Sequence, residues 1–164
     1  MDVFKDCGDG WHIEDDVYLS KTFRERIEGL DGIVNGFCCE AFDDVDAIGE
    51  VEAERMWSGF PCIHIPGEIA RECAEWVFTE GKEKHPDWYK TGAMCDTFFK
   101  AFCEERGYKC LNLKPNLVEH VDWLIGGSTI GRRKEIWRAK YFEELDPEFV
   151  KQVSYVTPGE KRFD

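Results

Sequence analysis

Residues 12–17, His-Ile-Glu-Asp-Asp-Val, set three consecutive carboxylates between apolar side chains. The apolar residues before the triplet predict a short strand, 10–13, that ends at the acidic residues. Because side chains alternate along an extended chain, Glu14 and Asp16 point to the same side. Such a pair offers oxygen ligands to a hard divalent cation or to a ligand bound beside it. The alternative is a solvated acidic turn, which is a common surface feature.

A second informative stretch, residues 115–122, reads Pro-Asn-Leu-Val-Glu-His-Val-Asp and follows a predicted strand. His120 is our candidate for a third metal ligand, because Mn²⁺ accepts imidazole as well as carboxylate. Glu119 or Asp122 would then orient the second ring nitrogen of His120. The alternative role for His120 is a core histidine that is hydrogen-bonded to a backbone carbonyl.

Short apolar runs alternate with amphipathic segments along the chain, which predicts a mixed α/β fold. Strands are predicted at 10–13, 33–38, 62–65 and 108–113. Helices are predicted at 21–30, 68–78, 94–106, 133–144 and 147–153. Residues 40–56 are expected to form an acidic surface loop with a short helical piece, and 79–92 a polar loop. We therefore expect one α/β domain over residues 1–164, with a short mixed sheet and flanking helices.

Composition indicates a folded protein outside the membrane. Hydrophobic residues make up 43% of the chain and aromatic residues 14%, which is too apolar for a disordered chain. No apolar run approaches the roughly 20 residues that a membrane helix needs. Residues 1–10 are polar and acidic, unlike a secretion signal, so we expect a cytoplasmic protein.

The net charge of −13 disfavours broad contact with nucleic acid or with anionic membranes. One basic segment, 132–140, interrupts the acidic chain and follows the second stretch. It is either a solvated helix face or a local contact to an anionic donor or acceptor.

Eight cysteines are present, but their spacing includes no C-x-x-C pair of the kind that binds zinc. We expect most of them to be buried thiols that pack as small apolar side chains. His64 lies in an apolar run, and we expect its polar atoms to be satisfied inside the core.

Asp96 precedes a run of phenylalanines at a predicted helix start. It is either a first-turn carboxylate that the helix dipole favours, or a carboxylate that takes a proton from an acceptor hydroxyl. Trp57, Trp88 and Trp123 are candidates either for stacking on a sugar ring or for core packing.

The order of these features resembles the C-terminal half of GT-A-type glycosyltransferases, especially small phage and bacterial ones. The resemblance covers roughly residues 10–145. Its ordered features are the segment 13–17, Trp57, the segment 63–66, Trp76, Asp96, the segment 115–120 and Ser128.

The resemblance implies metal-dependent transfer of a sugar from a nucleotide donor. The roles that it implies are metal binding by Asp16 and His120 with Mn²⁺ or Mg²⁺, donor binding by Glu14, Asp15 and Ser128, and catalysis by Asp96. The acceptor would be a modified DNA base or a surface glycan, and the net charge disfavours DNA. If a phage encodes the chain, we expect it to act in the host cytoplasm.

Members of this family hold the nucleotide with an α/β half that precedes the acidic triplet, and only 13 residues precede Glu14 here. Three explanations are open: a second polypeptide completes the site, another copy of the chain completes it, or the chain is a reduced descendant that no longer transfers sugar and acts by binding. The alternative function is a non-catalytic, acidic interaction protein, such as a phage inhibitor of a host defence. A third hypothesis is a thiol- or zinc-dependent module that uses the cysteines and His64.

Overall fold

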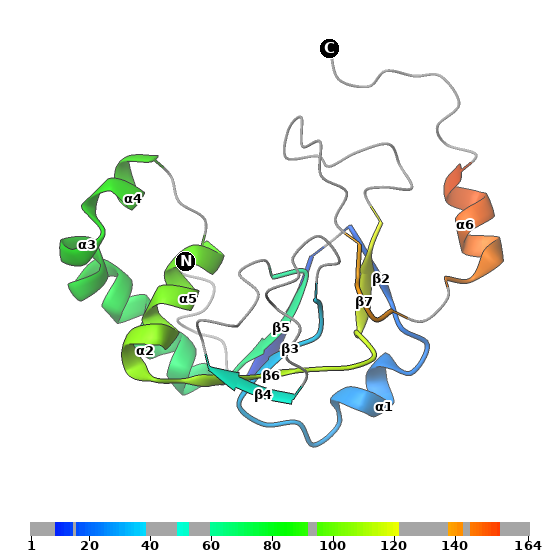
Figure 1. Cartoon of the computed structure of the whole chain (residues 1–164), viewed down its shortest axis with the longest axis horizontal. Helices are drawn as coiled ribbons and strands as arrows, with labels where there is room; N and C mark the ends of the chain where they lie inside the picture. The colour runs from blue at the N-terminus through cyan, green and yellow to red at the C-terminus, as the bar shows by residue number, and fades with distance from the viewer. Residues whose placement is uncertain are drawn as a thin grey trace, which may run out of the picture.

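The computed structural model describes residues 9–14, 16–38, 49–52, 60–91, 95–121, 138–142 and 145–154. At its centre is a five-stranded sheet with the strand order β1-β5-β3-β6-β4 (Figure 1). These strands are β1 (Gly10–Ile13), β5 (Cys62–Ile65), β3 (Ile33–Asn35), β6 (Lys109–Asn112) and β4 (Gly49–Glu52). Strands β3 and β6 run parallel, and the other neighbouring pairs are antiparallel. The fold is therefore mixed α/β, as the sequence predicts.

Strand β5, which lies between β1 and β3, is buried on both faces, which explains its almost uniformly apolar sequence. Because side chains alternate across a strand, Ile63 and Ile65 enter one core and Cys62 enters a second core on the opposite face. His64 shares the face of Cys62, and its Nδ1 lies 2.7 Å from the carbonyl oxygen of Gly32. The expectation that His64 is satisfied internally is therefore confirmed for its Nδ1 atom.

Helices α2 (Gly67–Phe78) and α5 (Cys95–Arg106) cover the face of the sheet to which Ile63 points (Figure 1). Both helices bury an apolar stripe with a spacing of three to four residues. The buried residues on these stripes are Ile69, Cys73, Trp76, Val77, Phe98, Phe99, Phe102 and Cys103. Helix α5 stops at Gly107, whose φ of 67° glycine adopts without steric cost. The predicted helices 68–78 and 94–106 are confirmed to within one residue at each end.

A second sheet of two strands, β2 (Val17–Leu19) and β7 (Val118–His120), packs on the other face of β5. Its core is shared with helix α1 (Phe23–Ile27) and contains Phe37, Cys62, Leu117 and Val118. Helix α6 (Pro147–Ser154) lies beyond β2 (Figure 1), where Phe149 packs on Tyr18 with ring centroids 4.4 Å apart. The two-stranded sheet positions His120, at the end of β7, and Asp16, just before β2.

The loop predicted for 79–92 is wrong, because two short helices, α3 (Glu80–Lys84) and α4 (Pro86–Thr91), occupy most of it. Helix α3 packs directly on Trp76, since Gly81 leaves room for the indole ring. Residues 49–52, inside the predicted acidic loop, form strand β4. Its alternation buries Val51 and exposes Glu50, which pairs with Lys109 on β6.

Two helix predictions also need correction. The helix predicted at 21–30 is confined to Phe23–Ile27, and Gly29 takes a positive φ of 73° just after it. The helix predicted at 133–144 is wrong over 138–142, where the backbone instead bonds to Cys38 and to Asn116. Residues 133–137 and 143–144 lie outside the described residues.

Within the described residues, none of the helices combines the length and the apolar character that crossing a bilayer requires.

Candidate metal centre

Glu14 and Asp16 lie at the corner where the chain leaves one sheet and enters the other. The backbone N–H of Glu14 donates to the carbonyl of Pro61 at 3.1 Å, which continues the β1–β5 pairing by one residue. Two residues later, the carbonyl of Asp16 accepts from the N–H of Val121 at 2.9 Å, which continues the β2–β7 pairing. Each carboxylate is therefore positioned by a different sheet.

His120 reaches this corner from the end of strand β7. Its Nε2 lies 3.5 Å from Oδ2 of Asp16 and 3.7 Å from Oε2 of Glu14. One potential ligand atom from each of the three residues lies within 4.8 Å of the other two. The imidazole is 5% exposed, whereas the carboxylates of Asp16 and Glu14 are 20% and 35% exposed, so solvent reaches the cluster from the carboxylate side.

This donor set fits a divalent cation. An ion that binds its ligands at about 2.1 Å can join atoms up to about 4.2 Å apart, and both distances from His120 fall within that limit. Mg²⁺ prefers a shell of oxygen atoms alone, whereas Mn²⁺ also accepts an imidazole nitrogen. Two carboxylates and one imidazole therefore suit Mn²⁺ better than Mg²⁺.

Asp96 lies in the first turn of helix α5 and is half-buried. Burial raises the pKa of its carboxyl, and the negative charge of Glu14 adds to the rise. The N–H of Thr97 donates to Oδ1 of Asp96 at 2.8 Å and opposes the rise in pKa. A carboxylate with a raised pKa is a stronger base than an ordinary aspartate. The predicted catalytic residue thus lies within electrostatic range of the metal cluster.

Glu119, which the sequence suggests as a residue that orients the ring of His120, has a different role in the structure. Alternation along β7 turns its side chain to the face opposite His120, and its Oε1 accepts from the N–H of Ala139 at 2.8 Å. Burial raises the pKa of Glu119 to about 7, while the Ala139 amide and the positive charge of Arg138 limit the rise. Glu119 thereby holds residues 138–142 against β7. Asp122, the other candidate for orienting His120, lies outside the described residues.

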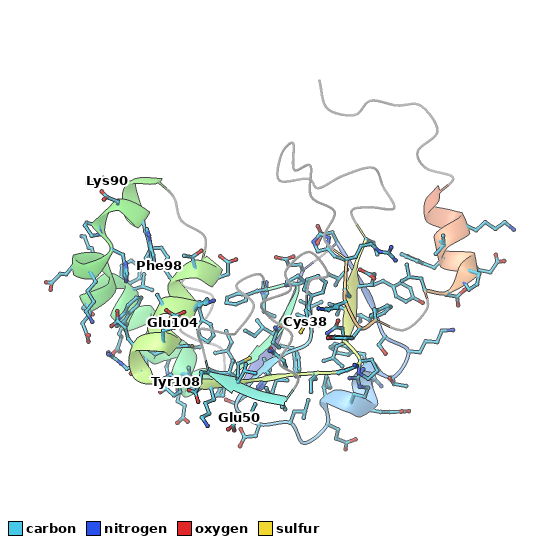
Figure 2. The ribbon with its side chains drawn as sticks, in the orientation of Figure 1. Cys38, Glu50, Lys90, Phe98, Glu104 and Tyr108 are labelled. Carbon is cyan, nitrogen blue, oxygen red and sulfur yellow. The ribbon has the colours of Figure 1, made fainter. Side chains whose placement is uncertain are left out.

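The sequence reasoning missed the part that Asn116 plays in supporting β7. Asn116 is fully buried, its N–H donates to the carbonyl of Tyr141 at 2.9 Å, and its Oδ1 accepts from the N–H of Tyr141 at 3.0 Å. Next to it, the N–H of Lys140 donates to the carbonyl of Cys38 at 2.8 Å; Cys38 is labelled near β7 in Figure 2. Because these partners are distant in sequence, no local pattern signals the contacts.

Several predicted residues cannot be placed in this site. Asp15 and Ser128, the other predicted donor-binding residues, lie outside the described residues, as do Trp57 and Trp123. Trp88 lies within the described residues, and it packs against the core between the five-stranded sheet and helices α2 and α5. Its ring stacks on His85 with centroids 3.9 Å apart and an interplanar angle of 9°. These contacts favour core packing over sugar binding for Trp88.

The cysteines whose side chains the structure describes are buried free thiols: Cys38, Cys62, Cys73, Cys103 and Cys110. Burial raises the pKa of Cys62 and of Cys110 to about 12, so both stay protonated at neutral pH. The thiolate is the form that binds metal and reacts. Among the described residues, the one three-residue cluster of potential ligands contains no cysteine. The described residues therefore give no support to a zinc or thiol centre that uses the cysteines and His64.

Comparison of the chain with protein-family models, with curated proteins and with solved structures finds no match. Its function must therefore be argued from its own residues and their geometry.

Proposed function

We propose that this protein is a GT-A-type glycosyltransferase that transfers a sugar from a nucleotide donor in a metal-dependent reaction. The cluster of Glu14, Asp16 and His120 carries the proposal, because it joins the acidic triplet to a buried histidine from a distant strand. A bound divalent cation would offset the negative charge that builds on a leaving diphosphate. Mn²⁺ is the proposed ion, since one of the three ligands is an imidazole.

The residues of the chain have separate tasks in this proposal. Asp16 and His120 hold the cation, and Glu14 adds a carboxylate that contacts the cation or the donor. Asp96 faces the acceptor and takes the proton from its hydroxyl group. The raised pKa of Asp96 suits this role, because proton transfer is most efficient when the pKa of the base approaches the working pH.

The proposed place of action is the cytoplasm. Its reducing conditions keep thiols free, in agreement with the five cysteines whose side chains are described, which are free thiols. A modified DNA base or a surface glycan is the proposed acceptor. A second polypeptide, or another copy of the chain, is the proposed source of further contacts to the nucleotide.

Calorimetric titration with a panel of nucleotide sugars, with and without Mn²⁺, tests this function. The informative variant is Asp16→Asn, which removes one carboxylate of the cluster. Its matched control is Asp87→Asn, which removes the same charge from a side chain that is 81% exposed on helix α4. We expect donor binding that requires Mn²⁺, is lost in the first variant and is retained in the second.

The alternative, a non-catalytic acidic interaction protein, predicts a different result. Partner binding would then survive both Asp16→Asn and Asp96→Asn, since neither the metal nor the base contributes to it. Failure of the wild-type protein to bind any donor with Mn²⁺, at concentrations high enough for self-association, would exclude a donor site made by one or more copies of this chain and favour this alternative.

A further inference from the structure

The five-stranded sheet has two outer strands among those that the structure describes, β1 and β4, and their open edges differ. On β4, Glu50 and Glu52 are exposed, and both pair with Lys109 of the neighbouring strand. Charged side chains of this kind keep another chain from pairing with an edge strand. Strand β1 carries no carboxylate, ammonium or guanidinium group, and it ends at Ile13, which is 36% exposed. The edge of β1 is therefore the one that a further strand can join.

The backbone of β1 presents hydrogen-bonding groups along this edge. The N–H of Glu14 donates to the carbonyl of Pro61 on the β5 side. Counting back from Glu14, every second residue of an antiparallel strand directs its N–H and C=O groups toward the same neighbour. The groups of Trp11 and Ile13 therefore point away from β5, and none of the described residues pairs with them. Two donors and two acceptors are available, on a strand that β5 already holds in place.

This pattern is complementary to itself. When two copies of β1 lie antiparallel about a two-fold axis through His12, Trp11 of each copy faces Ile13 of the other. The two donors of each copy then make four hydrogen bonds in total. The indole ring and the exposed Ile13 side chain lie side by side on one face of the joined sheet, and such aromatic and β-branched pairs stabilise strand pairing. Glu14 lies opposite Gly10 of the other copy, which has no side chain to cover the acidic corner.

We propose that two copies of this chain associate through antiparallel pairing of their β1 strands, which joins the two five-stranded sheets into one. In this dimer the segment 9–10 of the second copy lies beside Glu14 of the first. That segment is fixed, because Oδ1 of its Asp9 accepts from the N–H of Gly67 at 2.8 Å. The second copy would then supply the further contacts to the nucleotide. This use of the dimer rests on the proposed function, whereas the strand pairing does not.

The length of the strand and the charge of the chain determine how strong this dimer is. Pairing of strands only four residues long makes a small interface, and interfaces below roughly 1,200 Å² are typical of weak, transient complexes. Each copy carries a net charge of −13, and the repulsion between copies is screened over about 8 Å at physiological ionic strength. We therefore expect added salt to strengthen the dimer, whereas salt weakens a contact that is held by ion pairs.

A cysteine on the two-fold axis tests the pairing directly. In the proposed register His12 faces itself in a non-hydrogen-bonded pair, with Cα atoms about 4.5 Å apart, which a disulfide can span. His12→Cys should therefore cross-link in metal-free solution, where oxidised glutathione accepts the electrons of the two thiols. The matched control is Phe78→Cys at the end of α2, since Phe78 is 64% exposed and meets other molecules by chance more often. The wild type measures the background from the native cysteines.

Ile13→Lys tests the same edge by sedimentation equilibrium. The added charge lowers the net negative charge of each copy, so repulsion alone predicts a tighter dimer. Strand pairing predicts a dimer that is weaker by about tenfold or more, because the two-fold axis counts each lost contact twice. Phe78→Lys makes the same change of charge away from the edge, and it should dimerise at least as tightly as the wild type.

The proposal is overturned if the wild type stays monomeric at about 1 mM, or if Ile13→Lys dimerises as tightly as the wild type. It is also overturned if His12→Cys cross-links no faster than Phe78→Cys. Dimerisation without any binding of a donor and Mn²⁺ would support the strand pairing and count against the proposed function. Binding of a donor and Mn²⁺ by a protein that stays monomeric would support the proposed function and overturn the dimer.

Discussion

Asp16→Asn tests whether the acidic corner binds a cation, because ion binding to the folded state raises the melting temperature. At a free Mn²⁺ concentration 100 times the Kd, the folded state gains about 2.7 kcal/mol. For a chain of this size that gain corresponds to a rise of about 5–10 °C. Asp16 contributes one of three ligand atoms within 4.8 Å of one another. A 100-fold loss of affinity in the variant leaves about 0.4 kcal/mol, which is a rise of about 1 °C.

Differential scanning calorimetry with and without Mn²⁺ measures these shifts, and a chelator should reverse them. Asp87→Asn serves as the control because it removes an equal charge from an exposed helix. Comparison within each variant, with against without the ion, cancels any effect of the substitution on the metal-free protein. Equal shifts in wild type and Asp16→Asn, or no shift in the wild type, would refute the assignment of the metal centre.

Three further outcomes follow from other parts of the molecule. Gly81→Ala would place a methyl group 2.7 Å from the ring of Trp76, so we expect the free energy of unfolding, measured by chemical denaturation, to fall by about 1–3 kcal/mol. Helix propensity alone predicts a rise instead, and a rise would show that the ring moves freely. Glu119 has a folded pKa of about 7, raised from about 4.5, so the native state keeps a proton that the unfolded state releases, and metal-free stability should fall as pH rises between these values. In Glu119→Gln that decline, on the order of 3 kcal/mol, should disappear from urea midpoints measured across the range, and an unchanged pH profile would contradict the raised pKa. Asp96→Asn should lower the rate of sugar transfer by a factor of about 10²–10⁴ while the affinity for Mn²⁺ stays the same. If the variant and the wild type have similar rates in a donor-hydrolysis or transfer assay, Asp96 is not the base.

The main elements of the fold could be predicted from the sequence wherever the apolar pattern was long and regular. The stripe of α5, with Phe98, Phe99 and Phe102, and the apolar run of β5 are such cases. The helices α3 and α4 could not be predicted this way, because each has only five or six residues and is largely polar. Helix α3 is held by packing on Trp76, and α4 by the contact of Trp88 with Phe98 of α5; both partners lie outside the helices' own sequences.

The candidate site shows the same division between local and distant information. Alternation along the chain is enough to place Glu14 and Asp16 on one side, and the presence of His120 in an apolar run marks it as unusual. The pairing of β2 with β7, which brings the histidine to the carboxylates, depends on register between distant strands. The role of Glu119 was misjudged for the same reason, since its partner Ala139 lies 20 residues further along the chain.

The two-sheet corner also bears on how the chain folds. Strand β2 finds its partner in β7, about a hundred residues later, so the cluster needs one of the most distant contacts in the molecule. Contacts of large sequence separation form slowly, because a long loop must close before they stabilise anything. During synthesis, β1 and β2 leave the ribosome long before β5 and β7 exist. The acidic corner should therefore be completed only after most of the chain has emerged, and hydrogen exchange during refolding should show protection at Val121 later than within helix α5.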